Sequence, residues 1–256
     1  VTSSINVTAL NDAPVLTNGS TLSYAENTAA AVVNTAITVT DVDNMTLASA
    51  TVSITGGFSS DEDALGFAND GSTMGNIAAA YDSNTGALTL TSSDSSATLS
   101  QWQAALRAVT YRNTSDNPST AVRTLSYVVN DGINASTAIT SSINVTGVND
   151  APVLNGTASL VYPENANATA IHSDIMVDDA DHTTLTSATV SITAGYASGQ
   201  DVLGFVNDAS TGNITGSFNS NSGVMTLSSN GGTASLAQWQ TALRSVTYSN
   251  NSANPS

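Results

Sequence analysis

The sequence of 256 residues has no cysteine and no lysine, and arginine occurs at only four positions. Without cysteine, no disulfide can hold the fold together, and a zinc site built from thiolates is excluded. A net charge of −16 with so few cationic side chains excludes nucleic acid as a partner. No apolar run approaches the length of a membrane span, so we do not expect the chain to insert into a membrane.

Motifs of the common catalytic sites are also missing. No Gly-x-Ser-x-Gly, His-Glu-x-x-His or phosphate-binding loop occurs. The two histidines, His172 and His182, correspond to Asn34 and Asn44 in the repeat described next, so neither belongs to a repeated site. We therefore expect that the protein is not an enzyme.

Most of what the sequence does contain is present twice. Residues 11–16 read NDAPVL, and residues 149–154 read NDAPVL again, 138 positions later. The two copies then stay in step, with one single-residue gap near Met74, through shared segments such as SATVSIT, QWQ and VTY. A repeat of this length is one domain per copy, which is typical of tandem arrays that serve for reach, adhesion or assembly.

The repeat predicts three segments. Residues 11–148 form one complete repeat, and residues 149–256 form a second repeat that lacks its last two strands. Residues 3–8 (SSINVT) match residues 141–146, so we expect residues 1–10 to be the last strand of a preceding repeat. The simplest interpretation is a fragment of a longer protein. The alternative is that another copy of the chain supplies a missing strand to the open sheet edge.

Segments that alternate apolar and polar residues predict about seven short strands per repeat. In the first repeat they are residues 21–25, 31–40, 50–55, 87–91, 108–113, 124–130 and 141–146. Asn-x-Gly segments at 84–86 and 221–223 predict hairpin turns. The expected fold class is all-β, with tandem antiparallel β-sandwich domains of Greek-key type, each with one short helix.

The helix expected in each repeat carries a tryptophan. Trp102 and Trp239 each lie between leucines at helical spacing, behind a Thr or Ser that precedes a Gln by three positions, the signature of a capping box. We expect both indoles to pack into the core, while a role as sugar-stacking platforms is the alternative. Arg107 and Arg244 end the two helical segments and are expected to pair with partly buried carboxylates.

Acidic and amide side chains recur at matched positions in the two repeats. They are an Asn-Asp pair at 11–12 and 149–150, a Glu-Asn at 26–27 and 164–165, an Asp-x-Asp at 41–43 and 179–181, and an Asn-Asp-Gly at 130–132. Ca²⁺ takes six to eight oxygen ligands, which can come from distant loops. No lysine is present to neutralise these carboxylates, so their recurrence predicts Ca²⁺ binding. Two further recurring pairs are interpreted as turn or loop residues: Asp63 with Asp201, and Asp70 with Asp208.

These acidic elements resemble the calcium-binding elements of cadherin repeats. The whole repeat, with its opening NDAPV, late LSQWQAALRAVTY and closing VNDG…INVT, is similar to the cadherin-like tandem repeats of large secreted bacterial adhesins of the RTX type. The resemblance implies that ions sit between successive repeats. It implies one ligand set of Glu26, Asn149, Asp150, Asp179 and Asp181, with Asp131 as a possible addition. It implies a second set of Asn11, Asp12, Asp41 and Asp43, and it directs Glu164 toward a following repeat.

The sequence departs from the cadherin pattern in ways that predict fewer ions per site. Ala9 and Gly147 stand where the cadherin linker has an acidic residue, and Ala13 and Ala151 stand where it has a second Asn. The predicted function is a calcium-stiffened extender of a large extracellular bacterial adhesin, with the neighbouring repeats as its partners. The alternatives are a fibre or surface-layer subunit that assembles with copies of itself, and a carbohydrate-binding module for cell-surface glycans.

Overall fold

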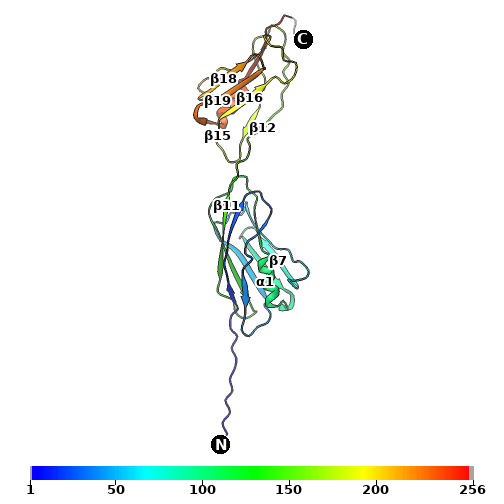
Figure 1. The fold of residues 1–256 in the computed structure, drawn as a ribbon, viewed down its shortest axis with the longest axis vertical. Coiled ribbons are helices and arrows are strands. Elements are labelled where there is room, and N and C mark those ends of the chain that lie inside the picture. The colour runs from blue at the N-terminus through cyan, green and yellow to red at the C-terminus, as the bar shows by residue number, and fades with distance from the viewer. Residues whose placement is uncertain (1, 254–256) are drawn as a thin grey trace. The chain divides into compact units, whose positions relative to one another are not determined.

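The computed structural model describes residues 2–253 of the chain (Figure 1). The chain divides into two compact units, residues 1–148 and 149–256, each of which is described by itself. The regular secondary structure of both units is mostly strand, with one α-helix in each and a short 3-10 turn, Ser93–Ser95 or Asn230–Gly232. The prediction of an all-β sandwich with one short helix per repeat is confirmed.

The first unit is built from three sheets. The larger sheet has the order β2-β11-β10-β5-β8-β7, and smaller sheets have the orders β3-β9-β6 and β1-β4. Its strands are β1 (Val15–Thr17), β2 (Thr21–Ala25), β3 (Ala31–Val32), β4 (Thr38–Thr40), β5 (Ser49–Gly56), β6 (Asp63–Gly66), β7 (Ile77–Asp82), β8 (Ala87–Ser92), β9 (Thr110–Asn113), β10 (Arg123–Asn130) and β11 (Ile139–Thr146).

One strand pairing departs from the expected antiparallel arrangement. β2 and β11 run parallel, with Thr21 opposite Ser142 and Ala25 opposite Thr146. β2 and β11, the first and last strands of this sheet along the chain, therefore point toward the same end of the unit. The segment expected as one strand over 31–40 is also broken in two, because the side chain of Asn34 accepts hydrogen bonds from the N–H groups of Ala36 and Ile37 and forms a turn.

The helix of the first unit forms for the predicted local reasons. α1 (Leu99–Arg107) begins with a complete capping box between Thr98 and Gln101, and it packs against β4. Trp102 on its inner face is fully buried, and its indole N–H donates to the carbonyl of Leu47 at 3.0 Å. The α1 face and alternate residues of the sheets together form one continuous apolar core.

The second unit repeats most of this architecture (Figure 1, yellow to red). Its sheets have the orders β16-β19-β18, β13-β21-β17, β12-β14 and β15-β20. Its elements are β12 (Val153–Asn155), β13 (Thr169–Ala170), β14 (Met176–Asp178), β15 (Thr184–Leu185), β16 (Ser187–Ser191), β17 (Asp201–Gly204), β18 (Ile214–Asn219), β19 (Val224–Ser229), β20 (Ala234–Ser235), α2 (Leu236–Arg244) and β21 (Thr247–Asn250).

The counterpart of the larger sheet is shorter in the second unit. β16, β19 and β18 match β5, β8 and β7, but the unit has no counterpart of β10 or β11 among its described residues. Residues 159–163, which match β2, are not a strand. In the first unit β2 bonds to β11 within its sheet, so without that partner its counterpart has no ladder to join.

Residues 2–10 are not a strand in the described part of the chain, and their assignment as the last strand of a preceding repeat stays a prediction. Residues 2–10 have no regular secondary structure, and Ile5, Val7 and Leu10 are each more than four-fifths exposed. The sequence of residues 3–8 is identical to that of β11 residues 141–146, which do form a strand. In β11 the backbone groups of this sequence bond to the neighbouring strands β10 and β2, and residues 3–8 have no such neighbours among the described residues.

Candidate functional site

A first acidic cluster lies at the end of the first unit where β10 ends. The Asp41 side chain closes a tight turn, because its Oδ1 accepts hydrogen bonds from the N–H groups of Asp43 at 3.1 Å and Asn44 at 2.9 Å. The N–H of Asp12 in turn donates to Oδ2 of Asp43 at 3.0 Å. Three of the four residues predicted as one ligand set, Asp12, Asp41 and Asp43, are thus brought together.

Asn11 connects this turn to Asp131. Its Nδ2 donates to Oδ2 of Asp131 at 2.7 Å, and its Oδ1 accepts from Nδ2 of Asn44 at 2.7 Å. Burial raises the pKa of Asp131, but hydrogen bonds from Asn11 and from the N–H groups of Asn134 and Ile133 outweigh it and hold the pKa below its ordinary value. Asp131 is therefore poised as a carboxylate within the first cluster.

The position of Asp131 corrects the predicted grouping, which added it to the set containing Glu26. β2 ends at Ala25, opposite Thr146 at the C-terminal end of β11, and Glu26 comes directly after it. β10 runs the other way, with Tyr127 opposite Ile139 at the N-terminal end of β11, and Asp131 comes just after β10. The two carboxylates therefore lie at opposite ends of the first unit.

Glu26 is held in an unusual environment. Its side chain is only 3% exposed, and its Oε1 accepts a hydrogen bond from the N–H of Val148 at 2.5 Å. Its Oε2 is shielded from solvent and has no hydrogen-bond partner among the described residues. A buried carboxylate oxygen without a partner is destabilising unless something else, such as a cation, satisfies it.

The counterpart of Glu26 in the second unit, Glu164, differs from it in solvent exposure and in the structure around it. Glu164 is exposed, and it lies in a stretch without strands. In the first unit the Glu26 N–H donates to the carbonyl of Thr146, so β11 and the residues after it hold the glutamate in place. The second unit has no such strand among its described residues, and Glu164 is left in solvent.

A second acidic cluster in the second unit repeats the hydrogen bonds of the first. The N–H of Asp150 donates to Oδ2 of Asp181 at 3.2 Å, and Oδ1 of Asp179 accepts from the N–H groups of Asp181 and His182. Asp179, Asp181 and His182 each offer a ligand atom within 4.8 Å of the others. Asn149 donates to the Asp150 carbonyl at 2.7 Å. All four predicted ligands on this side, Asn149, Asp150, Asp179 and Asp181, thus belong to one local structure.

A histidine lies within the second cluster. His182 stands where the first cluster has Asn44, and its Nδ1 lies 2.9 Å from Oδ1 of Asp181. The hydrogen bond to Asp181 and the charge of that carboxylate raise the pKa of His182. Burial raises the pKa of Asp181, yet its hydrogen bonds with His182, Asp179 and the Asp150 N–H lower it overall.

Each cluster also contains a shielded carboxylate oxygen without a partner. Oδ2 of Asp41 in the first cluster and Oδ2 of Asp150 in the second are out of solvent and have no hydrogen-bond partner in the described part of the chain. With Glu26, three residues from the predicted ligand sets therefore carry an unsatisfied oxygen. Oxygen donors of this kind suit Ca²⁺, and the residues present fit such an ion.

The two aspartate pairs interpreted as turn residues behave differently from each other. Asp70 and Asp208 do close turns, and Asp70 accepts hydrogen bonds from the N–H groups of Ser72 and Thr73. A hydrogen bond from the Thr73 hydroxyl, together with these two, lowers the pKa of Asp70 to about 2. Asp63 instead begins β6, is buried, and forms an ion pair at 3.2 Å with Arg123, which is itself fully buried.

The interpretation of Asp63 as a turn residue was therefore wrong, and so was the expectation for the helix-terminal arginines. Nε of Arg107 donates to the carbonyl of Ile37, and Nε of Arg244 donates to the carbonyl of Ile175, each at 2.8 Å. In the described residues the buried carboxylate is paired with Arg123 on β10. The sequence held one signal for this buried carboxylate, because Asp63 recurs as Asp201. The structure places each at the start of a strand.

The tryptophans do not form a sugar platform. Trp102 and Trp239 are both fully buried, and each indole N–H donates to a backbone carbonyl at 3.0 or 2.9 Å. The prediction of core packing is confirmed, and the tryptophan-based argument for a carbohydrate-binding module no longer holds.

Comparison with known proteins gives limited further information. No protein-family model matches the chain. A stretch of 125 residues is 33% identical to halomucin of Haloquadratum walsbyi, which covers 48% of this chain and 1% of halomucin. The chain thus corresponds to a very small part of the curated relative that it matches.

Two solved structures show weak likeness. Cadherin domains 1–5 of protocadherin gamma B2 cover 87% of this chain and 33% of their own at 14% identity, with a TM-score of 0.28. Domains 4–9 of the surface layer protein SbsC cover 88% and 28% at 10% identity, with a TM-score of 0.26. Neither likeness is strong enough to assign fold or function. In residues 2–253, neither α-helix has the length and apolar character needed to cross a bilayer.

Proposed function

We propose that the chain is a stretch of extracellular structural or adhesive repeats whose acidic clusters bind Ca²⁺. The observation that carries the proposal is that each cluster holds a shielded carboxylate oxygen without a partner among the described residues, Oδ2 of Asp41 in the first and Oδ2 of Asp150 in the second. Oε2 of Glu26, outside the clusters, shows the same feature in a residue that is only 3% exposed. An anion desolvated in this way is stabilised by a bound cation, and oxygen-only ligands select a hard one.

The ligands are assigned by unit. In the first cluster they are Asn11, Asp12, Asp41, Asp43 and Asp131, and in the second they are Asn149, Asp150, Asp179 and Asp181. Glu26 offers a further oxygen at the other end of the first unit, and Glu164 is its counterpart. Ca²⁺ bound to the folded form alone would stabilise each unit by mass action.

The role proposed for the repeats is mechanical. The resemblance to cadherin-like repeats adds that calcium stiffens a chain of such domains and so extends a binding domain away from a cell. The tandem repeat, the acidic composition and the similarity to a segment of halomucin support an extracellular location. Membership of a bacterial adhesin, and of the RTX type in particular, rests on the sequence resemblance alone.

Calorimetric titration with Ca²⁺ tests the ligand assignment. We expect Asp179→Asn/Asp181→Asn to abolish binding at the second cluster and Asp41→Asn/Asp43→Asn to abolish it at the first. The matched control is Asp70→Asn/Asp208→Asn, which removes the same charge from two exposed turns and should leave binding unchanged. Equal loss in the control would show that only overall charge matters, and absence of binding in the parent protein would overturn the proposal.

Stiffening needs a separate measurement. Small-angle X-ray scattering of the whole chain in Ca²⁺ should show a larger and better-defined maximum dimension than in chelator. The variant with both clusters disabled should give the chelator curve under both conditions. If Ca²⁺ binds but the scattering does not change, the ions stabilise the individual units, and the extender role is wrong.

A further inference from the structure

One side chain distinguishes the turn of the first acidic cluster from the turn of the second. Asn44 and His182 each follow an Asp-x-Asp directly, and each donates its backbone N–H to the first aspartate of that motif at 2.9 Å. The N–H of the linker aspartate also donates to the second aspartate in both units, at 3.0 and 3.2 Å. The two clusters therefore hold the same backbone turn with an asparagine at one position in the first unit and a histidine in the second.

Asn44 serves the first cluster as a hydrogen-bond donor. Its Nδ2 donates to Oδ1 of Asn11 at 2.7 Å and lies 3.4 Å from carboxylate oxygens of Asp43 and Asp131. An amide NH₂ group donates hydrogen bonds, and only the amide oxygen can accept them or bind a cation. The side chains of the first cluster therefore offer a cation oxygen atoms alone, which are the ligands that Ca²⁺ prefers.

His182 brings a nitrogen ligand into the second cluster. Its Nδ1 lies 2.9 Å from Oδ1 of Asp181 and 3.6 Å from Oδ1 of Asp179. One ligand atom from each of these three residues lies within 4.8 Å of the other two. Tetrahedral Zn²⁺, with bonds of about 2.1 Å to nitrogen and oxygen, holds its ligand atoms about 3.4 Å apart, so small side-chain movements bring these three around one ion.

The carboxylates of the second cluster are shielded from solvent. The Asp179 side chain is 2% exposed and that of Asp181 is 17% exposed. Asp150 is held at Asp181 by its own N–H, and its Oδ2 is out of solvent without a hydrogen-bond partner in the described chain. A shielded carboxylate oxygen without a donor is destabilising, and a cation bound beside it offsets that effect. Asp150 therefore offers a fourth ligand atom beside the other three.

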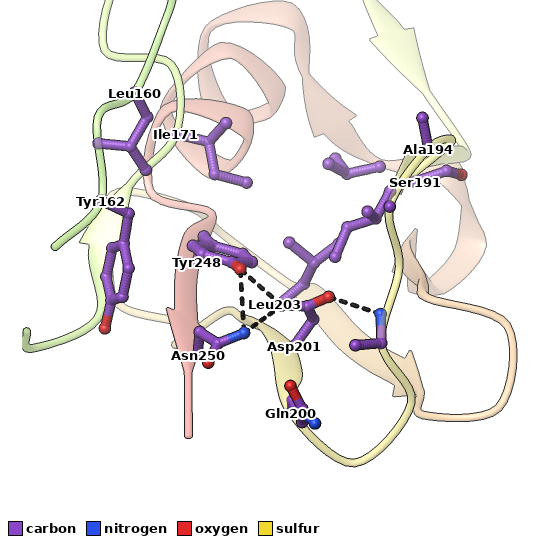
Figure 2. A pocket seen from close by; sticks show the side chains of 14 residues that line it. Leu160, Tyr162, Ile171, Ser191, Ala194, Gln200, Asp201, Leu203, Tyr248 and Asn250 are labelled. Atoms are coloured by element: carbon purple, nitrogen blue, oxygen red, sulfur yellow. Dashed lines mark hydrogen bonds between the residues drawn. The ribbon is translucent and has the colours of Figure 1, made fainter. Parts of the chain in front are cut away.

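An unsatisfied oxygen is not a general property of shielded carboxylates in the second unit. Asp201 is 5% exposed, and its Oδ1 accepts hydrogen bonds from the Tyr248 hydroxyl at 2.5 Å and from Asn250 Nδ2 at 2.6 Å (Figure 2). Its Oδ2 accepts from the Ala197 N–H at 2.7 Å. Burial raises the pKa of Asp201, but these hydrogen bonds lower it overall. Protein donors alone therefore stabilise the charge of Asp201, whereas Oδ2 of Asp150 has no such donor among the described residues.

We propose that the second cluster is a mixed nitrogen and oxygen site that selects a transition-series dication of the Zn²⁺ type, while the first cluster prefers Ca²⁺. Its ligands are His182, Asp179, Asp181 and Asp150. The inference rests on the proposed function in that the same acidic residues form a cation site. Imidazole is a good ligand for ions such as Zn²⁺, whereas Ca²⁺ takes oxygen ligands. The residue after the Asp-x-Asp thus sets which metal each unit takes, and one chain can hold two kinds of ion.

Calorimetric titration of the whole 256-residue protein with Zn²⁺, and separately with Ca²⁺, tests the role of the histidine. His182→Asn gives the second cluster the side chain that the first has at this position, so the turn has a precedent in the same chain. We expect it to weaken Zn²⁺ binding by about tenfold or more and to leave Ca²⁺ affinity unchanged within about twofold. Asp179→Asn/Asp181→Asn should abolish Zn²⁺ binding at the second cluster.

The matched control is His172→Asn. His172 is the other histidine of the chain, it also stands where the first unit has an asparagine, Asn34, and its Nδ1 lies 2.9 Å from Asp174, outside the cluster. This variant should bind Zn²⁺ as the parent does. Trp239 fluorescence verifies that each variant is folded.

Nuclear magnetic resonance identifies the ligand atom directly. In ¹⁵N-labelled protein, one equivalent of Zn²⁺ should shift the Nδ1 resonance of His182 and leave the resonances of His172 in place. One equivalent of Ca²⁺ should not produce the shift that Zn²⁺ produces, because Ca²⁺ does not bond to the imidazole nitrogen.

Three results would overturn the proposal. They are no saturable Zn²⁺ binding, Zn²⁺ affinity that is unchanged in His182→Asn, and equal losses in His182→Asn and His172→Asn, which would indicate binding to any histidine. Failure of this inference is distinguishable from failure of the calcium proposal. Ca²⁺ binding together with Zn²⁺ binding that does not need His182 rejects the metal preference alone. Zn²⁺ binding that needs His182, in a protein that does not bind Ca²⁺, rejects the calcium proposal and supports this one.

Discussion

The two units have closely similar sequences where residues 11–119 align with residues 149–256, yet their cores differ in a systematic way. Leu16 is 5% exposed in the first unit, while its counterpart Leu154 is 57% exposed in the second. Leu65 and Leu203 are equally buried, and so are Trp102 and Trp239. Packing around α1 and α2 is therefore shared, whereas packing around β10 and β11 is found in the first unit.

This difference separates local from non-local causes of structure. The capping boxes, the glycine hairpin turns and the aspartate networks around Asp63 and Asp201 form in both units. They depend on residues close in sequence or on strands that both units possess. Three features of the first unit have no equivalent in the second: the strand β2, the burial of Leu16 and the buried environment of Glu26. In the first unit these features depend on β10 and β11 or on contacts close to them.

The largest expected effect comes from removing the buried cation of the first unit. Arg123→Gln leaves Asp63 in the core without its charge partner, and breaking such a pair costs about 3–5 kcal/mol of stability. Urea unfolding of the first unit measures the loss. A Trp239→Phe background makes Trp102 the sole indole reporter, since the chain has two tryptophans.

The control for this prediction is Asp63→Asn in the Arg123→Gln background, which neutralises the orphaned carboxylate and should recover part of the loss. Solvent-exposed ion pairs contribute less than about 1 kcal/mol. If Arg123→Gln lowers the unfolding free energy of the first unit by no more than that, the ion pair does not explain a difference in stability between the units.

A matched pair of leucine substitutions tests the difference in burial directly. Leu16→Ala should destabilise the first unit by about 2–5 kcal/mol, because it leaves a cavity in a packed core. Leu154→Ala should change the second unit by no more than about 0.5 kcal/mol, because its side chain is already exposed. Denaturant midpoints from each unit's own tryptophan provide the measurement. Equal effects would show that the second unit is closed in solution.

The helix caps should not distinguish the units. Thr98→Ala and Ser235→Ala each remove the side chain that accepts from the third helical N–H, at a cost of about 1 kcal/mol. Thermal unfolding followed through Trp102 and Trp239 compares the two. Replacement by Ser and Thr respectively, which keeps the hydroxyl, should restore stability. A cost at one cap only would contradict the conclusion that α1 and α2 form for local reasons.

The smallest effect expected is a pH dependence in the second unit. The folded pKa of Asp201 lies below its ordinary value of 3.8, so the charged form stabilises the fold at neutral pH. That contribution is lost as the pH falls below about 4 and through the lowered pKa. Unfolding free energies between pH 3 and 6, read from Trp239 in a Trp102→Phe background, should fall less steeply in Asp201→Asn. Parallel curves for the two proteins would assign the acid sensitivity to other groups.

Much of the fold could be predicted because it is encoded locally. The strand predicted at 21–25 matches β2, and the capping boxes locate both helices. The parallel pairing of β2 with β11 could not be predicted, because residues about 120 positions apart set it. For the same reason the alternation of residues 124–130 predicted a strand but gave no sign that Arg123 reaches Asp63.

The candidate site shows the same division. The grouping of Asp12, Asp41 and Asp43 could be predicted from recurrence at matched positions, since each unit builds its cluster from one linker and one turn. Asp131 was grouped with the wrong end of the unit, because its place depends on the direction of β10 within the sheet. Whether these residues hold Ca²⁺ stays a prediction that titration can decide.

The parallel pairing of β2 with β11 has a consequence for a chain under tension. A force applied to the two ends of the first unit pulls the start of β2 one way and the end of β11 the other, along the strands. The five paired positions between Thr21–Ala25 and residues 142–146 are then loaded in shear, so their hydrogen bonds share the load and do not open one after another. The described part of the second unit has no such pair among its strands.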